Sequence, residues 1–544
     1  MPALRAFIRE SKEMEVTGCL GRSCLLFQKV WWISEREEKK VKGIWWIKRD
    51  FRISDNQCLA TGLDECEELL PFFCWENGIL SHHDYSAFHL QAQWQALNEL
   101  RKSLRVRGCP LLEECGEVIE VLENLRRRYR FEVLYSHQET GNLVTYDRDL
   151  RVAEWCKDRC VRWREFNASS VLRGGNADRR RVKLRQVDYR RQKTLSIPSK
   201  LKPPSQLPML GKPWAWNELV NGFAKFNGCS PMPSLQKVSE REAWKTLESF
   251  LHHRGQGYSG GISSPNEAFT HGSRLSPHLA WGTMSLRTVF QELDRRILKL
   301  KEEKIRGGWL RSLRAFQSRL HWRDHFIQRL EAFPRLEELP LNPAYQDIPY
   351  REDHDLLQAW LSGHTGFPMV DACMRCLSET GFLNFRMRAM VVSFACFGLH
   401  LSWRFIHPPL AQRFLDYEPG IHLSQLQMQA GVIGFNTLRV YSPKKQFLDQ
   451  DPDGVFVRKW IPELRDCATV EIAEIENHPV RGYDPAIIRL SSQAKDMKER
   501  IYEVRRSAEG RQITSSVLQT HGSRKRMRSK KNREPSGQMA LFKI

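Results

Sequence analysis

The hydrophobic pattern changes partway along this chain of 544 residues, and the change limits the folds that the chain can adopt. Short apolar runs at 43–47, 69–73 and 132–135 have the length and composition of strands. Between the second and third runs, residues 88–104 place apolar side chains at helical spacing. Strands that alternate with helices predict a parallel sheet covered on both faces, so we expect a Rossmann-like or flavodoxin-like α/β domain at residues 43–172.

From residue 241 onward the pattern is helical. Ala243, Trp244, Leu247, Phe250 and Leu251 form one apolar face, and residues 390–395 are apolar nearly all round. We therefore expect an all-α domain at residues 241–506. The GxGxxG pattern at 255–260 follows a helical pattern and no strand, so it does not predict a dinucleotide site of the Rossmann type.

Three other segments lack the pattern of a folded core. Residues 1–42 are predicted to be a poorly structured extension, 173–240 a basic and proline-rich linker between the domains, and 507–544 a disordered basic tail. The chain has 85 basic and 64 acidic residues, and its net charge of +21 favours a polyanionic partner such as DNA. The alternative is that this charge serves solubility alone.

The composition also bears on the compartment. No apolar stretch is long enough to predict a membrane span, so no membrane partner is expected. Fourteen cysteines without the spacing of a disulfide framework, and no evident secretory signal, predict a reducing compartment. We expect a DNA-associated protein of bacterial-type cytoplasm, or of the nucleus or an organelle in a eukaryotic host, and we expect a monomer.

Several ordered motifs carry a family resemblance. They read WIKRDFRISDNQCL from Trp46, GSRLSPHLAWGTMS from Gly272, RLHWRDHF from Arg319, and SPKKQFLDQDPDGVFVRKWIPEL from Ser442. Together they resemble the photolyase/cryptochrome family, with gaps, from about residue 43 to about residue 464. The resemblance implies that the helical domain binds FAD. It also implies that the α/β domain can hold an antenna chromophore, but no residue identifies one, so the antenna remains unknown.

The resemblance implies a set of cofactor-binding residues. The GSRLS segment matches a motif, usually TSRLS, that wraps the FAD phosphates, and hydroxyl, guanidinium and helix N-terminal amide groups suit a pyrophosphate. Arg388 and Asp416 match an ion pair beside the isoalloxazine ring, Glu418 replaces a second Asp, and His422 replaces an Asn that faces the flavin. The alternative is a structural ion pair among helices. The expected cofactor-binding residues are Tyr258, Ser273, Arg274, Leu275, Ser276, Arg386, Arg388, Asp416, Glu418 and His422.

The resemblance also implies residues for catalysis and for DNA binding. Trp322 and Arg323 match the Trp and Arg that hold a flipped pyrimidine dimer. The alternative for Trp322 is packing in a core. Trp403 matches the middle residue of a chain of three Trp that reduces the flavin. The expected catalytic residues are Trp322, Arg323 and Trp403, and the expected DNA-binding residues are Arg319, Trp322, Arg386 and Met428.

Four positions depart from the pattern of dimer-repairing photolyases. Arg319 replaces a Glu that hydrogen-bonds the pyrimidine bases, Phe385 an Asn, Met428 a cleft Trp, and Leu426 the Trp nearest the flavin. These changes place dimer repair in question. A photoreceptor of the cryptochrome type, or a DNA-associated flavoprotein without repair activity, is therefore the alternative to a blue-light-driven DNA repair lyase that acts on pyrimidine lesions. A third hypothesis is a DNA-binding adaptor that holds no flavin.

Two short patterns bear on partners and metals. Gln538, Leu541 and Phe542 resemble a QxxLF peptide that docks on the bacterial sliding clamp, or match it by chance. Cys373 and Cys376 form a CxxC without a second pair, and His321 and His325 lack the Glu of an HExxH motif, so no metal is expected.

Overall fold

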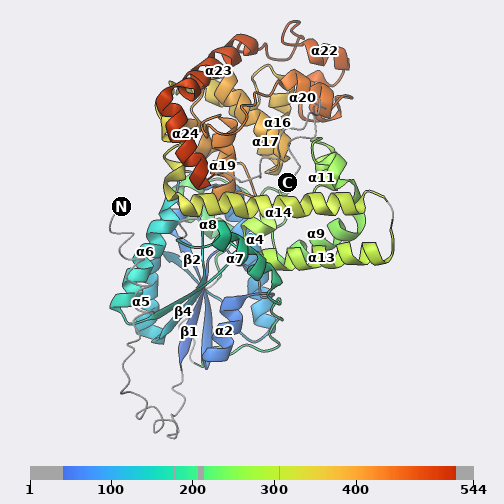
Figure 1. Cartoon of the computed structure of the whole chain (residues 1–544). Coiled ribbons are helices and arrows are strands. Elements are labelled where there is room, and N and C mark those ends of the chain that lie inside the picture. The colour runs from blue at the N-terminus through green and yellow to red at the C-terminus, as the bar shows by residue number, and fades with distance from the viewer. Residues whose placement is uncertain (1–40, 175–178, 206–212, 306, 522–544) are drawn as a thin grey trace, which may run out of the picture.

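The computed structural model describes residues 41–174, 179–205, 213–305 and 307–521, and it contains an α/β domain and a helical domain (Figure 1). The predicted N-terminal extension therefore lies almost wholly outside the described residues. The QxxLF peptide formed by Gln538, Leu541 and Phe542 also lies outside them.

The α/β domain is built on five parallel strands in the order β3-β2-β1-β4-β5. The strands are β1 (Lys42–Ile47), β2 (Glu68–Glu76), β3 (Leu112–Gly116), β4 (Val133–His137) and β5 (Arg162–Phe166). The predicted Rossmann-like parallel sheet is confirmed. Its helices are α2 (Gln57–Glu65), α3 (Asn77–Leu80), α4 (Ala87–Val106), α5 (Val118–Tyr129) and α6 (Leu143–Asp158).

Helices cover both faces of the sheet, and this explains why the central strands are apolar throughout. Trp45 and Ile47 pack in one core cluster with α2 and α4, whereas Ile44 and Trp46 pack in another with α5 and α6. Neighbouring residues of a strand point to opposite faces, so a strand buried on both sides has no polar alternation. All four side chains are at most 1% exposed.

The second domain consists of helices, as predicted, and the long helix α14 runs along its boundary with the sheet domain (Figure 1). No described helix is both long enough and apolar enough to cross a bilayer. The longer helices are α9 (Glu240–Ser249), α13 (Leu286–Glu302), α14 (Trp309–Ala332), α15 (His354–Ser362), α16 (Pro368–Thr380), α17 (Phe385–Ser393), α18 (Trp403–Ala411), α19 (Pro419–Gln429), α20 (Pro443–Gln450) and α23 (Leu490–Arg506). The shorter ones are α10 (Tyr258–Gly261), α11 (Glu267–His271), α12 (Ser276–Ala280), α21 (Val455–Trp460) and α22 (Thr469–Glu474).

Three expectations about local structure need correction. Trp244 is 37% exposed on α9, whereas the other residues of that apolar face are buried, so the predicted face was too wide. The linker contains the helices α7 (Arg179–Arg191) and α8 (Trp216–Gly222). The first part of the predicted disordered tail forms α24 (Ala508–His521), which Thr514 ties to Asn342 through a 2.9 Å hydrogen bond.

The polar motif after β1 joins the two domains. Arg49 donates hydrogen bonds of 2.8 Å to the carbonyls of Ala280 and Tyr417, and Arg52 donates one of 2.9 Å to the carbonyl of Gly282. Asp55, which is 3% exposed, accepts hydrogen bonds from Arg287 and Ser285. These contacts hold the carboxyl edge of the sheet against the helical domain, near α12 and α13 and at the segment before α19.

A histidine on α12 makes stability depend on pH. His278 is fully buried, and its ring nitrogens lie 3.0 Å from Thr283 Oγ1 and 3.3 Å from Gln236 Nε2. Burial lowers the pKa of His278 to about 4. Between this pKa and its ordinary value near 6.5, the unfolded chain binds a proton that the folded chain does not, so stability falls as pH decreases through this window.

We expect His278→Gln to remove that part of the acid sensitivity. In the wild type, His278 lowers the free energy of unfolding by up to about 3 kcal/mol between pH 6.5 and pH 4, because each pKa unit corresponds to about 1.4 kcal/mol. The variant should lack this loss. Urea unfolding of the full chain over this pH range measures the slope. His364→Gln changes an exposed histidine and is the control; equal slopes for the two variants would contradict the assignment.

Candidate cofactor site

An ion pair between α17 and the segment before α19 lies at the centre of the expected flavin site. Arg388 Nη2 donates hydrogen bonds of 2.9 and 2.8 Å to the two carboxylate oxygens of Asp416, and Arg388 Nε donates one of 2.8 Å to the carbonyl of Leu383. The Arg388 guanidinium also lies over the ring of Phe414, 4.0 Å from its centroid. Four contacts thus fix a charged group in a largely enclosed place.

The segment that precedes α12 adds a second guanidinium to the same region. Arg274 has a left-handed backbone with φ of 58°, and its guanidinium lies 3.7 Å from the ring centroid of Phe382 and 5.2 Å from that of Phe269. Burial lowers the pKa of Arg274 to about 10, although Asp416 opposes the change. The guanidinium thus packs against two aromatic rings, which contact each other edge to face, near the Arg388–Asp416 pair.

The structure explains why Gly272 stands where the family usually has Thr. A Cβ atom on Gly272 would lie 2.3 Å from the backbone oxygen of Ala268, closer than atoms can approach. The neighbouring Ser273 side chain accepts a 3.4 Å hydrogen bond from the Leu275 amide, and Ser276 is exposed at the start of α12. Two hydroxyls and the Arg274 guanidinium therefore remain in this segment to meet a phosphate.

His422 on α19 completes this region. Its ring centroid lies 5.3 Å from that of Tyr417, 6.1 Å from that of Phe414 and 5.1 Å from that of His407. Burial lowers the pKa of His422 well below its ordinary value, and His407 and Arg388 lower it further. His422 is therefore neutral near pH 7, with one ring nitrogen that donates and one that accepts.

Buried polar atoms without partners show that this region suits a large polar ligand. The buried polar atoms of the described residues that lack a hydrogen-bond partner include Arg274 Nη1, Asn384 Oδ1, Arg386 Nε and His422 Nε2. Unpaired buried polar atoms are costly, so a ligand that pairs with them would be stabilised. FAD offers diphosphate and ring oxygens to the guanidinium and imidazole groups, and the residues present fit it.

One face of α14 carries the expected substrate residues. Arg323 Nη2 donates hydrogen bonds of 3.1 Å to Glu418 Oε2 and 3.2 Å to the carbonyl of Leu279, so Glu418 pairs with Arg323 and not with Arg388. Four residues earlier on α14, Arg319 lies beside the hydroxyl of Tyr258. Burial raises the pKa of Tyr258 to about 12. The face therefore connects α10 at one end with the start of α19 at the other.

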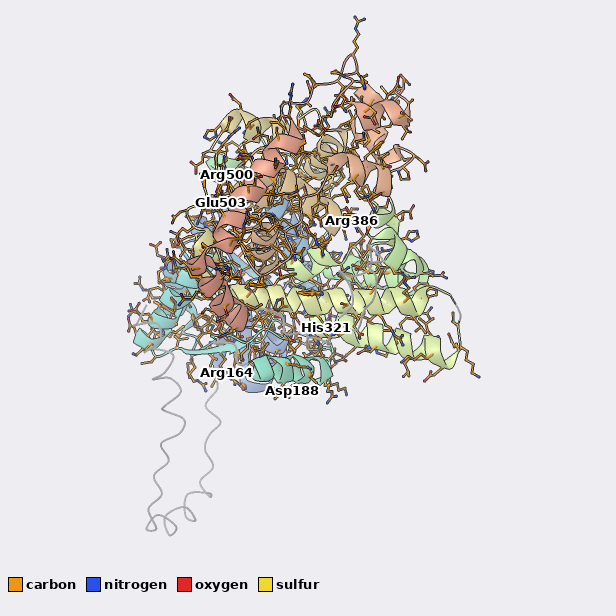
Figure 2. All side chains as sticks on the ribbon, turned by 45° about the horizontal axis from the view of Figure 1, so that its top comes forward. Arg164, Asp188, His321, Arg386, Arg500 and Glu503 are labelled. Atoms are coloured by element: carbon orange, nitrogen blue, oxygen red, sulfur yellow. The ribbon has the colours of Figure 1, made fainter. Side chains whose placement is uncertain are left out.

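Trp322 lies between these two arginines and is partly exposed. Its ring stacks on Phe326 with a centroid distance of 5.5 Å and an interplanar angle of 26°, and it meets the edge of His325 at 5.4 Å. In Figure 2, Arg386 on α17 and His321 on α14 are labelled on opposite sides of α14. His321 packs against Phe290 of α13 and stands apart from this site.

Other expected residues lie in apolar surroundings. Trp403 is fully buried in the main core of the helical domain, and Leu426 is 2% exposed in the same core. Met428 packs against a small apolar cluster that includes Leu423, whereas Phe385 is 45% exposed. The sequence motifs did not indicate Phe269, Phe382 or Phe414, because aromatic residues that support a guanidinium have no characteristic spacing.

Two cavities lie where the domains meet. The first is lined by residues that include Lys48, Glu139, Arg323 and Glu418, and the second by residues that include Trp75, Asn142, Arg148 and Trp281. Both open between the carboxyl edge of the sheet and the helical domain. The fold and the site around Arg388 and Asp416 suit one class: a two-domain protein whose helical domain can bind a polar cofactor.

Comparisons with known proteins agree with this class. Residues 43–190 match the family described as DNA photolyase, and residues 316–503 match the FAD binding domain of DNA photolyase. A deoxyribodipyrimidine photo-lyase of Synechococcus sp. is 26% identical over 84% of this chain and 95% of its own length. Cryptochrome-1 of Sinapis alba is 28% identical over 79% of this chain and 87% of its own length.

A solved structure shares the fold. The archaeal photolyase of Sulfolobus tokodaii, described with two FAD molecules, has a TM-score of 0.71 and 24% identity, and the match covers 85% of this chain and all of that one. The chain belongs to the photolyase/cryptochrome family. The predicted all-α FAD-binding domain and its cofactor, FAD, are thereby confirmed.

Proposed function

We propose that this protein is a FAD-dependent, blue-light-driven DNA repair enzyme that splits pyrimidine lesions. The partly exposed Trp322, held by stacking on Phe326 between Arg319 and Arg323, is the observation that carries the proposal. A flat aromatic face beside two cations suits a base that has left the duplex, because stacking does not depend on sequence and the cations meet the adjacent phosphates. The net charge of +21 favours the same partner.

The side chains have separate tasks in this proposal. Bound FAD supplies light absorption and the electron that opens the lesion. Arg274, Arg386 and Arg388 hold the cofactor, and Asp416 keeps Arg388 in place. Trp322 positions the flipped base, and the ion pair with Glu418 fixes Arg323 next to it. Trp403 takes part in electron supply to the cofactor, although Leu426 interrupts the direct route and cannot be oxidised.

The second candidate function is a cryptochrome-like photoreceptor that lacks repair activity. It is favoured by Arg319, a cation where repair enzymes have an acceptor, and by the apolar side chains of Phe385, Leu426 and Met428. In either role DNA is the proposed partner. We also propose that Gln538, Leu541 and Phe542 dock on a sliding clamp. Deletion of residues 538–544 is expected to abolish the pull-down of this protein by the clamp. Unchanged pull-down would contradict the proposal.

The repair assay uses an oligonucleotide with one pyrimidine dimer, with and without blue light. Wild-type protein is expected to remove the dimer only in the light. Trp322→Ala is expected to bind this DNA about 5-fold to 150-fold more weakly, because stacking of one base contributes about 1–3 kcal/mol. It should retain its flavin, because Trp322 is assigned to the substrate.

Trp244→Ala removes an exposed Trp from the same domain and is the matched control. Equal affinity of the Trp322→Ala and Trp244→Ala variants for dimer-containing DNA would contradict the role of Trp322. A wild-type protein that carries flavin and changes its absorption in blue light, but leaves the dimer intact, would favour the photoreceptor.

A further inference from the structure

Side chains of metal-binding type from three segments converge where the α/β domain meets the helical domain. His82, His83 and Asp84 lie between α3 and α4, Glu337 ends the short helix η4 (Pro334–Glu337), and His407 lies on α18. One ligand atom from each of His82, His83 and Glu337 lies within 4.8 Å of the other two, and the same holds for Asp84, Glu337 and His407. Glu337 is common to both groups.

Three imidazole nitrogens surround one carboxylate oxygen. Glu337 Oε1 lies 3.2 Å from His83 Nε2, 3.8 Å from His82 Nε2 and 3.9 Å from His407 Nε2. Two ligands of a tetrahedral zinc ion are about 3.3–3.4 Å apart, because each lies about 2.0–2.1 Å from the metal. The other oxygen, Glu337 Oε2, accepts a 3.2 Å hydrogen bond from the Leu143 amide, which holds Oε1 towards the histidines.

The side chain of His407 indicates that a ligand binds in this cluster. It is 2% exposed, and neither of its ring nitrogens has a hydrogen-bond partner among the described residues. Within the same ranges, Glu337 Oε1 also makes no hydrogen bond of suitable geometry, although His83 Nε2 lies 3.2 Å away. Nearly all buried polar groups find partners, because an unpaired one costs free energy. A cation between Glu337 and the imidazoles would satisfy these atoms together.

A second carboxylate orients one of the imidazoles. Asp84 Oδ1 lies 2.7 Å from His82 Nδ1, which leaves His82 Nε2 free to face Glu337. Asp84 Oδ2 accepts hydrogen bonds of 2.9 Å from Asn142 and 2.7 Å from Tyr417. A carboxylate that accepts from the far nitrogen of a metal-bound histidine is the usual support of such a ligand.

We propose that His82, His83, His407 and Glu337 bind one divalent transition metal of the zinc type, with Asp84 as the positioning residue for His82. Three imidazoles and one carboxylate suit zinc and disfavour magnesium, which prefers oxygen ligands and water. His83 is half exposed, so the metal can enter from solvent and the ring can move to close the ligand set.

The charges around the cluster favour a cation. Two carboxylates face the imidazoles of the cluster: Glu337 Oε1 lies 3.2 Å from His83 Nε2, and Asp84 Oδ1 lies 2.7 Å from His82 Nδ1. Lys225 is the opposing cation; its ammonium bonds to the carbonyl of His82, on the backbone side.

Such a metal would bridge the two domains next to the cofactor site. His82 and His83 belong to the α/β domain, and Glu337 and His407 to the helical domain. The ring of His407 lies 5.1 Å from that of His422. The sequence predicted no metal, because ligands at positions 82, 83, 337 and 407 form no local motif and meet only through the fold.

The test is a titration of the full chain with zinc after removal of metals by a chelator. We expect one zinc ion per chain by competition with a chromogenic chelator, and no saturable binding of magnesium. His83→Ala and His407→Ala are expected to lose this stoichiometric binding, and Asp84→Asn to weaken it about 10-fold to 100-fold. Zinc is also expected to raise the midpoint of thermal unfolding of wild-type protein.

His364→Ala is the matched control, because His364 pairs with Asp484 on the surface and belongs to neither ligand group. It should bind zinc as the wild type does. His83 is half exposed, so its replacement leaves the core intact, and an unchanged circular dichroism spectrum verifies the fold. The proposal is overturned if wild-type protein shows no one-to-one zinc binding, or if both histidine variants bind zinc as tightly as the wild type.

Discussion

Replacing Asp416 with Ala is expected to yield protein that purifies without FAD. The substitution removes both carboxylate oxygens that accept hydrogen bonds from the Arg388 guanidinium, which stays partly buried beside the ring of Phe414. Loss of one member of a hydrogen-bonded, desolvated ion pair costs about 2–5 kcal/mol, so FAD affinity should fall by at least about 30-fold. The measurement is the flavin absorbance per chain of purified protein, followed by titration with added FAD.

The control removes a similar ion pair from the same domain. Arg375 donates hydrogen bonds of 2.8 and 2.9 Å to the two carboxylate oxygens of Glu463, whose side chain is more exposed than that of Asp416. Glu463→Ala should therefore keep its full flavin content. An Asp416→Ala variant that retains as much flavin as Glu463→Ala would show that the pair serves only to hold α17 to its neighbour.

Replacing Gly282 with Ala is expected to separate the two domains or to destabilise the whole chain. Gly282 has φ of +63°, and a Cβ there would lie 1.8 Å from the backbone oxygen of Arg49 and 3.0 Å from the Cα of Asp50. The left-handed conformation costs about 1–2 kcal/mol for a residue with a Cβ, and overpacking costs about 1–3 kcal/mol more. Urea unfolding and limited proteolysis of the full chain measure the loss.

A second glycine separates the two causes. Gly108 has a similar φ of +76°, but a Cβ on it would meet nothing within 4 Å. Gly108→Ala should therefore show the conformational cost alone, and Gly282→Ala a distinctly larger loss. Equal losses in the two variants would mean that the Arg49 segment moves aside at little cost.

Much of the fold could be predicted from local patterns. The strands at 43–47 and 69–73 and the helix at 88–104 follow from apolar runs and helical spacing, which are properties of short segments. Trp244 was placed wrongly because a helical wheel does not show how wide the buried stripe is. The helices α7 and α24 were missed because much of their sequence is polar. The contact of Thr514 with Asn342 stabilises α24.

The site was predictable only in part. The resemblance indicated Arg388 and Asp416 as an ion pair, and the structure pairs them. It indicated Glu418 only as the replacement of a second Asp, and the ion pair of Glu418 with Arg323 was not predicted. Partner choice depends on distances between helices, which a single sequence does not contain. The histidine cluster around Glu337 shows the same limit, because its members are separated by up to several hundred positions in the chain.

The contacts of Asp55 bear on how this protein can be divided or recombined. Its carboxylate satisfies Arg287 and Ser285 at the start of α13, inside a joint where Arg49 and Arg52 also reach helical-domain carbonyls. A fragment that contains only the helical domain would leave Arg287 without its Asp55 partner, on an apolar surface that becomes exposed to water. A chimera whose sheet domain comes from a relative therefore needs an acid at the position of Asp55 and arginines at the positions of Arg49 and Arg52. Without them the two domains will not pack against each other.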